Sequence, residues 1–141
     1  MANTNLSAQI SVGRATKTRN IIYWISTAWL ALGMISTGGI QLFKMKDEVE
    51  NITALGYPVY FLTIIGAWKI LGVIAILIPK YPLLKEWAYA GFFFVMSGAL
   101  FSRIAAGDGF AEIAPALLLI VLIVVSWYFR PATRRLIPAN Q

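Results

Sequence analysis

Four long apolar runs constrain the fold of this chain more than any other feature, because each has about the length that a helix needs to cross a hydrocarbon core, roughly 20 residues. They cover residues 21–43, 57–78, 87–106 and 111–129. None shows the alternation of polar and apolar residues that is typical of membrane β-strands, so we expect helices. A hydrophobic fraction of 59% exceeds that of soluble globular proteins. The sequence therefore predicts an all-α integral membrane protein, built as a four-helix bundle.

The positive charges outside these runs predict the orientation of the bundle, because loops rich in Lys and Arg stay on the cytoplasmic side of a membrane. Eight such residues lie in the two tails and in the connection between the second and third runs, and three lie on the opposite side. Both termini are therefore expected in the cytoplasm. We expect one membrane domain over residues 21–129, between cytoplasmic tails at 1–20 and 130–141. The first tail lacks an apolar core, so it is expected to be disordered and not to be a signal peptide.

The chain contains neither cysteine nor histidine. This excludes disulfides, thiolate metal sites, haem ligation by histidine and the commonest general base, so we expect no metal and no haem. The net charge of +6 is mostly the orientation signal just described. It predicts attraction to anionic membrane lipids and no binding of nucleic acid.

One lysine, Lys69, lies near the middle of the second apolar run. Insertion of a lysine at a helix centre costs roughly 3 kcal/mol, which the surrounding Leu, Ile, Phe and Val residues can outweigh. At about 1.5 Å per residue, Lys69 lies roughly 18 Å from the outer boundary, and no carboxylate shares this depth. Two interpretations remain open. In the first, Lys69 is functional: it lines a wet cavity, loses its proton, or receives an anionic or carbonyl ligand. In the second, Lys69 is structural and reaches Glu112 through water.

Three further charged residues lie toward the outer ends of the third and fourth runs and complete the set of candidate ligand or cavity residues. Arg103 and Glu112 each lie about one turn from the end of their run, so they are able to pair. Asp108 follows Gly107 in a tight break, where it is suited to cap the fourth helix.

Small residues mark the expected contacts between helices, since they let helix backbones approach closely. They are Gly66 and Gly72, which flank the lysine of the second run, and Gly91, Gly98 and Ser102, which form one stripe on the third. We expect these residues to serve helix packing and not to contact a ligand directly. Aromatic residues near the span ends are typical of an interfacial belt. They include Trp24, Trp87, Tyr89 and Trp127.

Several short motifs follow one another between about Leu42 and Pro138. They are Leu55-Gly56-Tyr57-Pro58, Gly66-Ala67-Trp68-Lys69-Ile70-Leu71-Gly72, Lys85-Glu86-Trp87, Gly98-Ala99, Gly107-Asp108 and Ser126-Trp127-Tyr128-Phe129-Arg130-Pro131. In order and spacing they resemble the bacterial DoxX-like membrane proteins. The resemblance implies a small four-helix bundle of the bacterial inner membrane. Members often carry a carboxylate at the position of Lys69 and a histidine at the position of Arg103, and both departures weaken the transfer of a redox or proton-relay role.

The leading functional hypothesis is a noncatalytic DoxX-like protein that acts as an accessory subunit, or binds a lipid or small ligand in a polar cavity around Lys69. DoxX itself names a subunit associated with a thiosulfate:quinone oxidoreductase. One alternative is therefore the membrane subunit of a quinone-linked complex, which would need a partner carrying the redox centre. A small transporter or channel is another. Quinone or lipid is the expected ligand, and membrane lipids, a redox subunit and a second copy of the chain are the candidate partners.

Overall fold

The computed structural model describes residues 2–137, and these residues form five α-helices and one short 3₁₀ helix. The elements are α1 (Ala2–Leu42), α2 (Lys46–Ala54), α3 (Tyr60–Leu77), α4 (Pro82–Ala106), α5 (Phe110–Tyr128) and the 3₁₀ helix η1 (Ala132–Arg134). Four of the helices, α1, α3, α4 and α5, are long and apolar enough to cross a membrane. The predicted all-α fold with four membrane-spanning helices is therefore confirmed.

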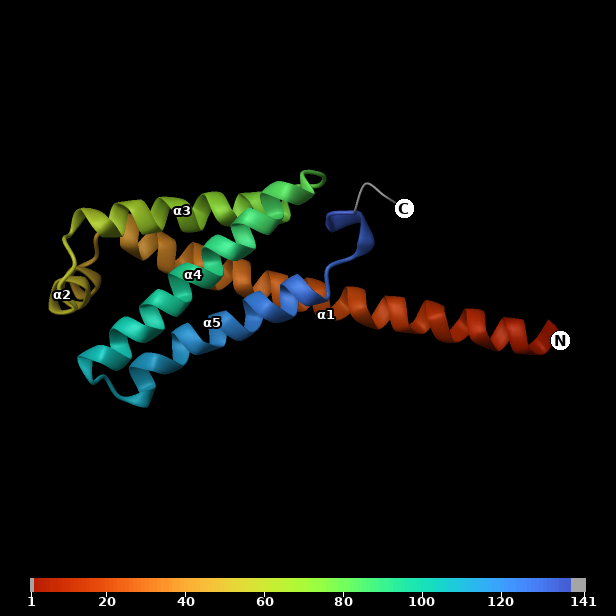
Figure 1. The fold of residues 1–141 in the computed structure, drawn as a ribbon. Helices are drawn as coiled ribbons and strands as arrows, with labels where there is room; N and C mark the ends of the chain where they lie inside the picture. The colour runs from red at the N-terminus through yellow and green to blue at the C-terminus, as the bar shows by residue number, and fades with distance from the viewer. Residues whose placement is uncertain (1, 138–141) are drawn as a thin grey trace.

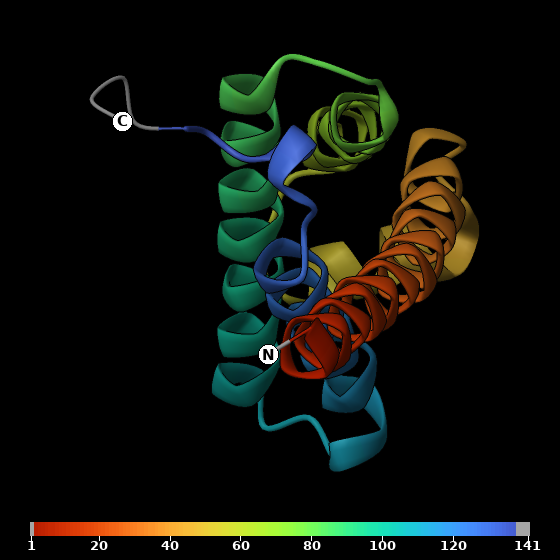
Figure 2. The ribbon, with the colours of Figure 1, turned by 90° about the vertical axis from the view of Figure 1, so that its right-hand side faces the viewer.

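The four long helices form a closed arrangement in which each has two neighbours. Helices α3 and α5 both pack against α1, and both also pack against α4. Successive long helices run in opposite directions (Figure 1), and Figure 2 shows the bundle from the end at which α1 begins. All four helices supply side chains to one apolar core. Its buried members are Leu30, Ala31, Met34, Val73, Ile76, Tyr89, Phe92, Met96, Leu119 and Ile123.

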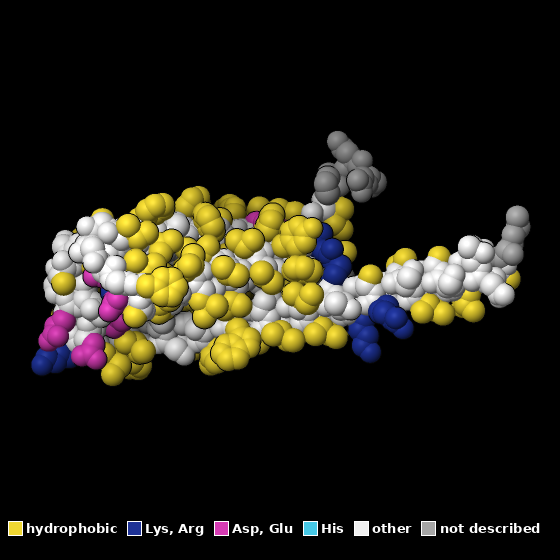
Figure 3. Space-filling model, turned by 90° about the horizontal axis from the view of Figure 1, so that it is seen from below, with side chains coloured by type: hydrophobic (Ala, Val, Ile, Leu, Met, Phe, Trp, Pro, Cys, Tyr) yellow, Lys and Arg dark blue, Asp and Glu magenta, His cyan; other side chains and the backbone are white. Residues whose placement is uncertain are grey.

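Apolar side chains also cover the outside of the bundle, as Figure 3 shows for one face. Large residues such as Trp29, Trp68 and Phe94 are 63%, 66% and 71% exposed. On a soluble protein so much exposed apolar surface would be a liability, whereas in a bilayer it is the surface that lipid chains contact. On the face in Figure 3 the charged side chains gather at the two ends of the bundle and along the projecting part of α1.

The N-terminal segment differs from the expected disordered tail. Helix α1 begins at Ala2, continues without a break into the first apolar run and projects beyond the bundle (Figure 1). Residues 2–20 contain no proline, and a helix that already exists gains one hydrogen bond for each residue added. Ser7, Ser11 and Thr16 also donate to carbonyls three or four residues earlier in this segment. Residues 1 and 138–141 of the expected tails lie outside the described residues.

The connections also contain helical structure that the sequence interpretation missed. Helix α2 lies in the acidic connection, and its first turn carries Asp47 and Glu48, which the helix dipole favours at an N-terminus. Helix α4 begins at Pro82 and not at the expected Trp87. Proline is well suited to the first turn of a helix because it has no N–H to leave unpaired. Lys80 and Tyr81, with φ of 67° and 52°, turn the chain sharply before it.

Candidate functional site

Lys69 is buried between α3 and α1, with only 4% of its surface exposed. Its ammonium donates a hydrogen bond to Thr37 Oγ1 at 3.1 Å. The Thr37 hydroxyl in turn donates to the carbonyl of Gly33 at 2.8 Å. An ammonium has three N–H donors, and this is the single hydrogen bond that it makes among the described residues. Lys69 therefore keeps donor capacity that the bundle itself does not use.

Close contact between the backbones of α1 and α3 brings Lys69 to this position. A Cβ atom added at Gly66 would lie 2.8 Å from the carbonyl oxygen of Gly38, which is closer than real Cβ contacts allow. A Cβ atom added at Gly38 would lie 3.1 Å from the Cβ of Lys69. Gly66 thus lies at a helix contact, and its partner Gly38 was missed by the sequence interpretation. The signal for Gly38 was its place near Gly33 and Thr37 on one small-residue stretch of α1.

Gly72, the other small residue beside Lys69, lies at the contact between α3 and α4. A Cβ atom added at Gly72 would lie 2.5 Å from the ring of Phe92, so the aromatic ring packs directly on the glycine. Because Phe92 is 4% exposed, it has little freedom to move away. Lys69 is therefore flanked by a contact with α1 on one side and by a contact with α4 on the other.

The stripe predicted on α4 does not form a close contact within this chain. A Cβ atom added at Gly91 or at Gly98 would meet no other atom within 4 Å, so neither glycine is held against a neighbouring helix. The expectation of tight packing at these two positions is wrong within this chain, because Gly91 and Gly98 are both exposed. Ser102 does contact another part of the bundle, since its hydroxyl shares a hydrogen bond at 2.9 Å with the hydroxyl of Tyr57, in the connection between α2 and α3.

The outer charged residues pair differently from the expectation. Arg103 donates to Asp108 at 3.0 Å, and both side chains are about one quarter exposed. Asp108 is therefore occupied by Arg103 and does not cap α5, whose N-cap residue is Gly109. Glu112 is exposed and takes part in none of the ion pairs within residues 2–137. The expected Arg103–Glu112 pair is absent there, and Glu112 makes no direct ion pair with Lys69.

A different carboxylate, Glu48 on α2, contacts α1, the helix that carries the hydrogen-bond partner of Lys69. Glu48 accepts a hydrogen bond from the amide of Gln41 at 3.5 Å, and Gln41 lies one helical turn beyond Thr37 on α1. Sequence reasoning missed this residue because depth was counted along the spans, whereas α2 folds back over the end of the bundle (Figure 1). Lys69 still has no carboxylate in direct contact.

A groove of about 520 Å³ lies between α3 and α4 beside Lys69. It was expected to be a polar cavity, but Lys69 is the one ionisable residue in its lining. The other lining residues are Ile65, Trp68, Leu71, Gly72, Ile74, Ala75, Ile78, Leu84, Trp87, Ala88, Gly91, Phe92 and Val95. Trp68 and Trp87 are 66% and 68% exposed, so these two aromatic residues face the surroundings of the bundle. The groove is therefore suited to an apolar chain.

A second group of polar residues lies at the end of the bundle where α3 ends and α4 begins. Lys85 is 1% exposed and donates to the carbonyls of Ala75, at 3.0 Å, of Ile76, at 3.2 Å, and of Ile78. These carbonyls lie in the last turn of α3, where a helix leaves its acceptors without intrahelical donors. Lys85 thus stabilises the C-terminus of α3 and has no donor to spare, in contrast to Lys69.

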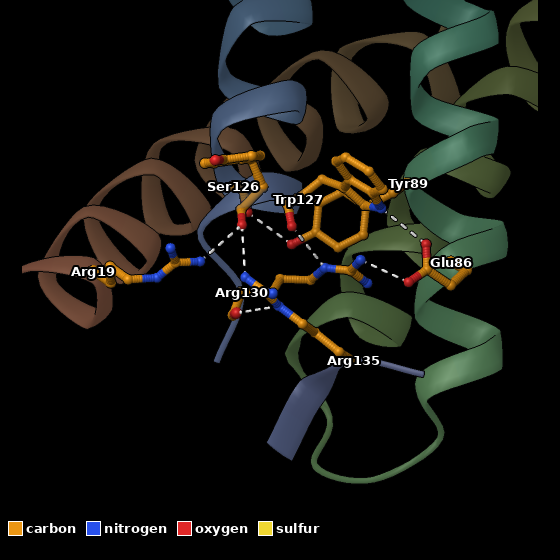
Figure 4. Close-up of polar contacts among 8 residues, drawn as sticks. Arg19, Glu86, Tyr89, Ser126, Trp127, Arg130 and Arg135 are labelled. Atoms are coloured by element: carbon orange, nitrogen blue, oxygen red, sulfur yellow. Dashed lines mark hydrogen bonds and ion pairs between the residues drawn. The ribbon is translucent and has the colours of Figure 1, made fainter. Parts of the chain in front are cut away.

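Arg130 joins α4 to α5 at the same end (Figure 4). Its guanidinium donates to Glu86 at 2.6 Å and to the carbonyl of Trp127 at 2.9 Å, and Trp127 donates to the other oxygen of Glu86 at 2.8 Å. Arg130 is 4% exposed and lies over the rings of Tyr89 and Trp127, at 5.1 and 5.4 Å from their centroids. The sequence interpretation had counted Arg130 in the orientation signal and in one motif of the resemblance, and had not predicted its pairing with Glu86.

Buried hydroxyl groups connect this ion pair to the core. Tyr89 shares a hydrogen bond with Ser126 at 2.7 Å, and Ser126 shares another with Thr27 on α1 at 2.6 Å. Tyr89 is 2% exposed, so its expected place in an interfacial belt is wrong. Hydroxyl groups buried in an apolar bundle are costly unless they are paired, and here each satisfies the next. This second group therefore has a structural role in holding three helices together.

Comparison with known proteins agrees with this architecture. A comparison with protein families matches residues 25–126 with the DoxX-like family. Comparisons with curated proteins and with solved structures gave no match. The matched segment covers more than half of the chain, and it contains Lys69, both glycine contacts and the groove between α3 and α4. The chain is a member of the DoxX-like family of membrane proteins.

Proposed function

We propose that this chain is a noncatalytic membrane protein that holds the apolar tail of a lipid-soluble molecule in the groove between α3 and α4. The observation that carries the proposal is the groove itself. Its volume of about 520 Å³ lies within the roughly 300–1,000 Å³ that is usual for small-ligand sites. Its lining offers one ionisable group, which supports a binding role in preference to acid–base chemistry.

Lys69 supplies the polar part of the proposed recognition. The ammonium uses one of its three donors on Thr37, and the others are available to an acceptor. An anionic or carbonyl oxygen at this depth would satisfy a donor that is otherwise left unpaired in an apolar medium. The ligand is therefore a molecule with a long apolar tail and an oxygen acceptor that reaches Lys69. The ester of a membrane lipid and the ring of an isoprenoid quinone both meet this description.

The proposal is tested by filling the groove at Gly91. The variant Gly91→Leu adds a side chain at a lining position where the new Cβ atom meets no other atom within 4 Å, so the backbone accepts the substitution. Gly98→Leu is the matched control, because it makes the same change at another open position of α4 that does not line the groove. Native mass spectrometry of the gently extracted proteins measures the bound lipid or quinone. We expect about tenfold weaker retention in Gly91→Leu, equivalent to about 1.4 kcal/mol, and unchanged retention in Gly98→Leu.

The mass of the bound molecule separates the two ligand classes, and equal retention by wild type, Gly91→Leu and Gly98→Leu would remove the groove as the site. If the chain is instead the membrane subunit of a quinone-linked complex, a redox protein should also purify with it. A transporter predicts flux of substrate into proteoliposomes that contain this chain alone.

A further inference from the structure

The end of the bundle that contains Arg130 carries a strong excess of positive charge. Six cationic residues lie there, which are Arg19, Lys80, Lys85, Arg130, Arg134 and Arg135. Glu86 is the one acidic residue of the sequence at this end, since the other five lie in α2 or around the turn between α4 and α5. Glu86 already pairs with Arg130. Among residues 2–137, five cations therefore lie at this end without a carboxylate side chain to balance them.

Two of these cations converge on one point (Figure 4). Arg19, from α1, and Arg135, from the segment after η1, both donate to the carbonyl oxygen of Tyr128, at 3.4 and 2.8 Å. Arg135 also donates to the carbonyl of Arg130 at 2.7 Å, which fixes its position. The shared acceptor holds two like-charged guanidinium groups side by side, and a neutral carbonyl offsets little of their repulsion. An anion placed between them would relieve that repulsion.

The chemistry of these side chains indicates which anion fits. A guanidinium presents several N–H donors in a planar fork that matches two oxygens of a phosphate. Arg19 and Arg135 each use only part of their donors on backbone carbonyls, and Arg19 is exposed while Arg135 is half-buried. The two groups together can therefore present donors to several oxygens of one phosphate.

The surroundings of the pair indicate where that phosphate comes from. The guanidinium of Arg19 lies over the rings of Tyr128 and Phe129, at 5.8 and 5.6 Å from their centroids. The next turns of the bundle toward its centre expose Trp24 and Trp127, at 47% and 44%. Charge on one side and exposed aromatic surface on the other is the pattern of a membrane interface, where lipid phosphates lie.

We propose that Arg19 and Arg135 form a binding site for the phosphate of an anionic phospholipid, whose acyl chains lie along the exposed apolar side chains of α1 and α5. The buried Arg130–Glu86 pair holds the end of α5, and so positions the Tyr128 carbonyl on which both arginines converge. This site is separate from the groove between α3 and α4, and either can exist without the other.

The test measures binding of phosphatidylglycerol to the full chain in detergent, with phosphatidylcholine as reference lipid. The double variant Arg19→Gln/Arg135→Gln removes both guanidinium groups. The control Arg14→Gln/Lys17→Gln removes the same charge from exposed positions of α1, where neither residue takes part in an ion pair among the described residues. Binding is measured in about 0.5 M salt, at which the bound phosphate is largely screened from charges that lie a helical turn or more away. We expect the double variant to bind phosphatidylglycerol about tenfold more weakly and the control to bind it nearly as wild type does.

Each other outcome overturns the proposal in a distinct way. Equal weakening in the control would mean attraction by net charge alone, and unchanged binding in the double variant would mean that the lipid binds elsewhere. Full competition by inorganic phosphate would assign the site to free anions. The variant Arg19→Lys/Arg135→Lys guards against misfolding, because it keeps the charge and loses only the forks. We expect it to bind with intermediate affinity, and wild-type affinity in this variant would contradict recognition by guanidinium geometry.

Discussion

Replacing Lys69 by methionine tests whether this buried lysine serves a ligand or the fold. Methionine keeps the length of the side chain and removes the charge. The lysine costs roughly 3 kcal/mol at the centre of a spanning helix. Its one hydrogen bond, to Thr37, returns about 1.5–3 kcal/mol, the usual range for a charged donor. Thr37 keeps its own bond to Gly33 after the change. The free energy of unfolding of Lys69→Met should therefore equal that of wild type or exceed it by about 1 kcal/mol.

Equilibrium unfolding in mixed micelles measures this change, and binding of lipid or quinone is measured on the same samples. Binding should fall although stability does not, because the substitution removes the donor that we propose for the oxygen of the ligand. Adding Glu112→Gln should change stability by the sum of the two single effects, since Glu112 is exposed and unpaired and distant residues add. Destabilisation by about 3–5 kcal/mol, rescued by Glu112→Gln, is the signature of a broken buried pair and would refute this reasoning.

Three further predictions follow from the geometry. Lys85→Met should destabilise the bundle by about 1–3 kcal/mol in the same unfolding assay, because the carbonyls of Ala75 and Ile78 at the end of α3 lose their donor, and a neutral effect would contradict the capping role. Gly66→Ala should cost about 1–3 kcal/mol because its Cβ would strike the Gly38 carbonyl, whereas Gly98→Ala should cost nothing, and equal melting temperatures would disprove the α1–α3 contact. Reporter fusions at Gln141 and after Glu50 should give cytoplasmic and external signals, and an external C-terminus would contradict the orientation expected from the Lys and Arg distribution.

The sequence predicted the number and approximate limits of the spans because that information is local. An apolar run long enough to cross a bilayer is recognisable without knowledge of its neighbours. The projecting part of α1 and the helix α2 were missed for the opposite reason. Both are polar segments that become helical through the elements to which they are joined, and hydropathy carries no signal for this.

The contacts between helices were only partly predictable, because spacing along one helix does not reveal which face meets a neighbour. Gly66 and Gly98 look alike in the sequence, but only Gly66 lies against another backbone. The prediction that Arg103 pairs with Glu112 was wrong for a related reason. Asp108 reaches back across the tight turn between α4 and α5, and the local turn geometry decides this pairing, whereas depth in the membrane does not.

The two buried lysines show how the structure separates a structural charge from a candidate functional one. Lys69 and Lys85 are both almost fully buried, at 4% and 1% exposed. Lys85 meets three backbone carbonyls that a helix end offers in any case, so the fold alone accounts for its presence. Lys69 meets one hydroxyl, and that hydroxyl already has another partner. A membrane bundle that needed only stability would be served better by an apolar residue at this position, and this difference in partners is the reason to look for the function of the chain beside Lys69.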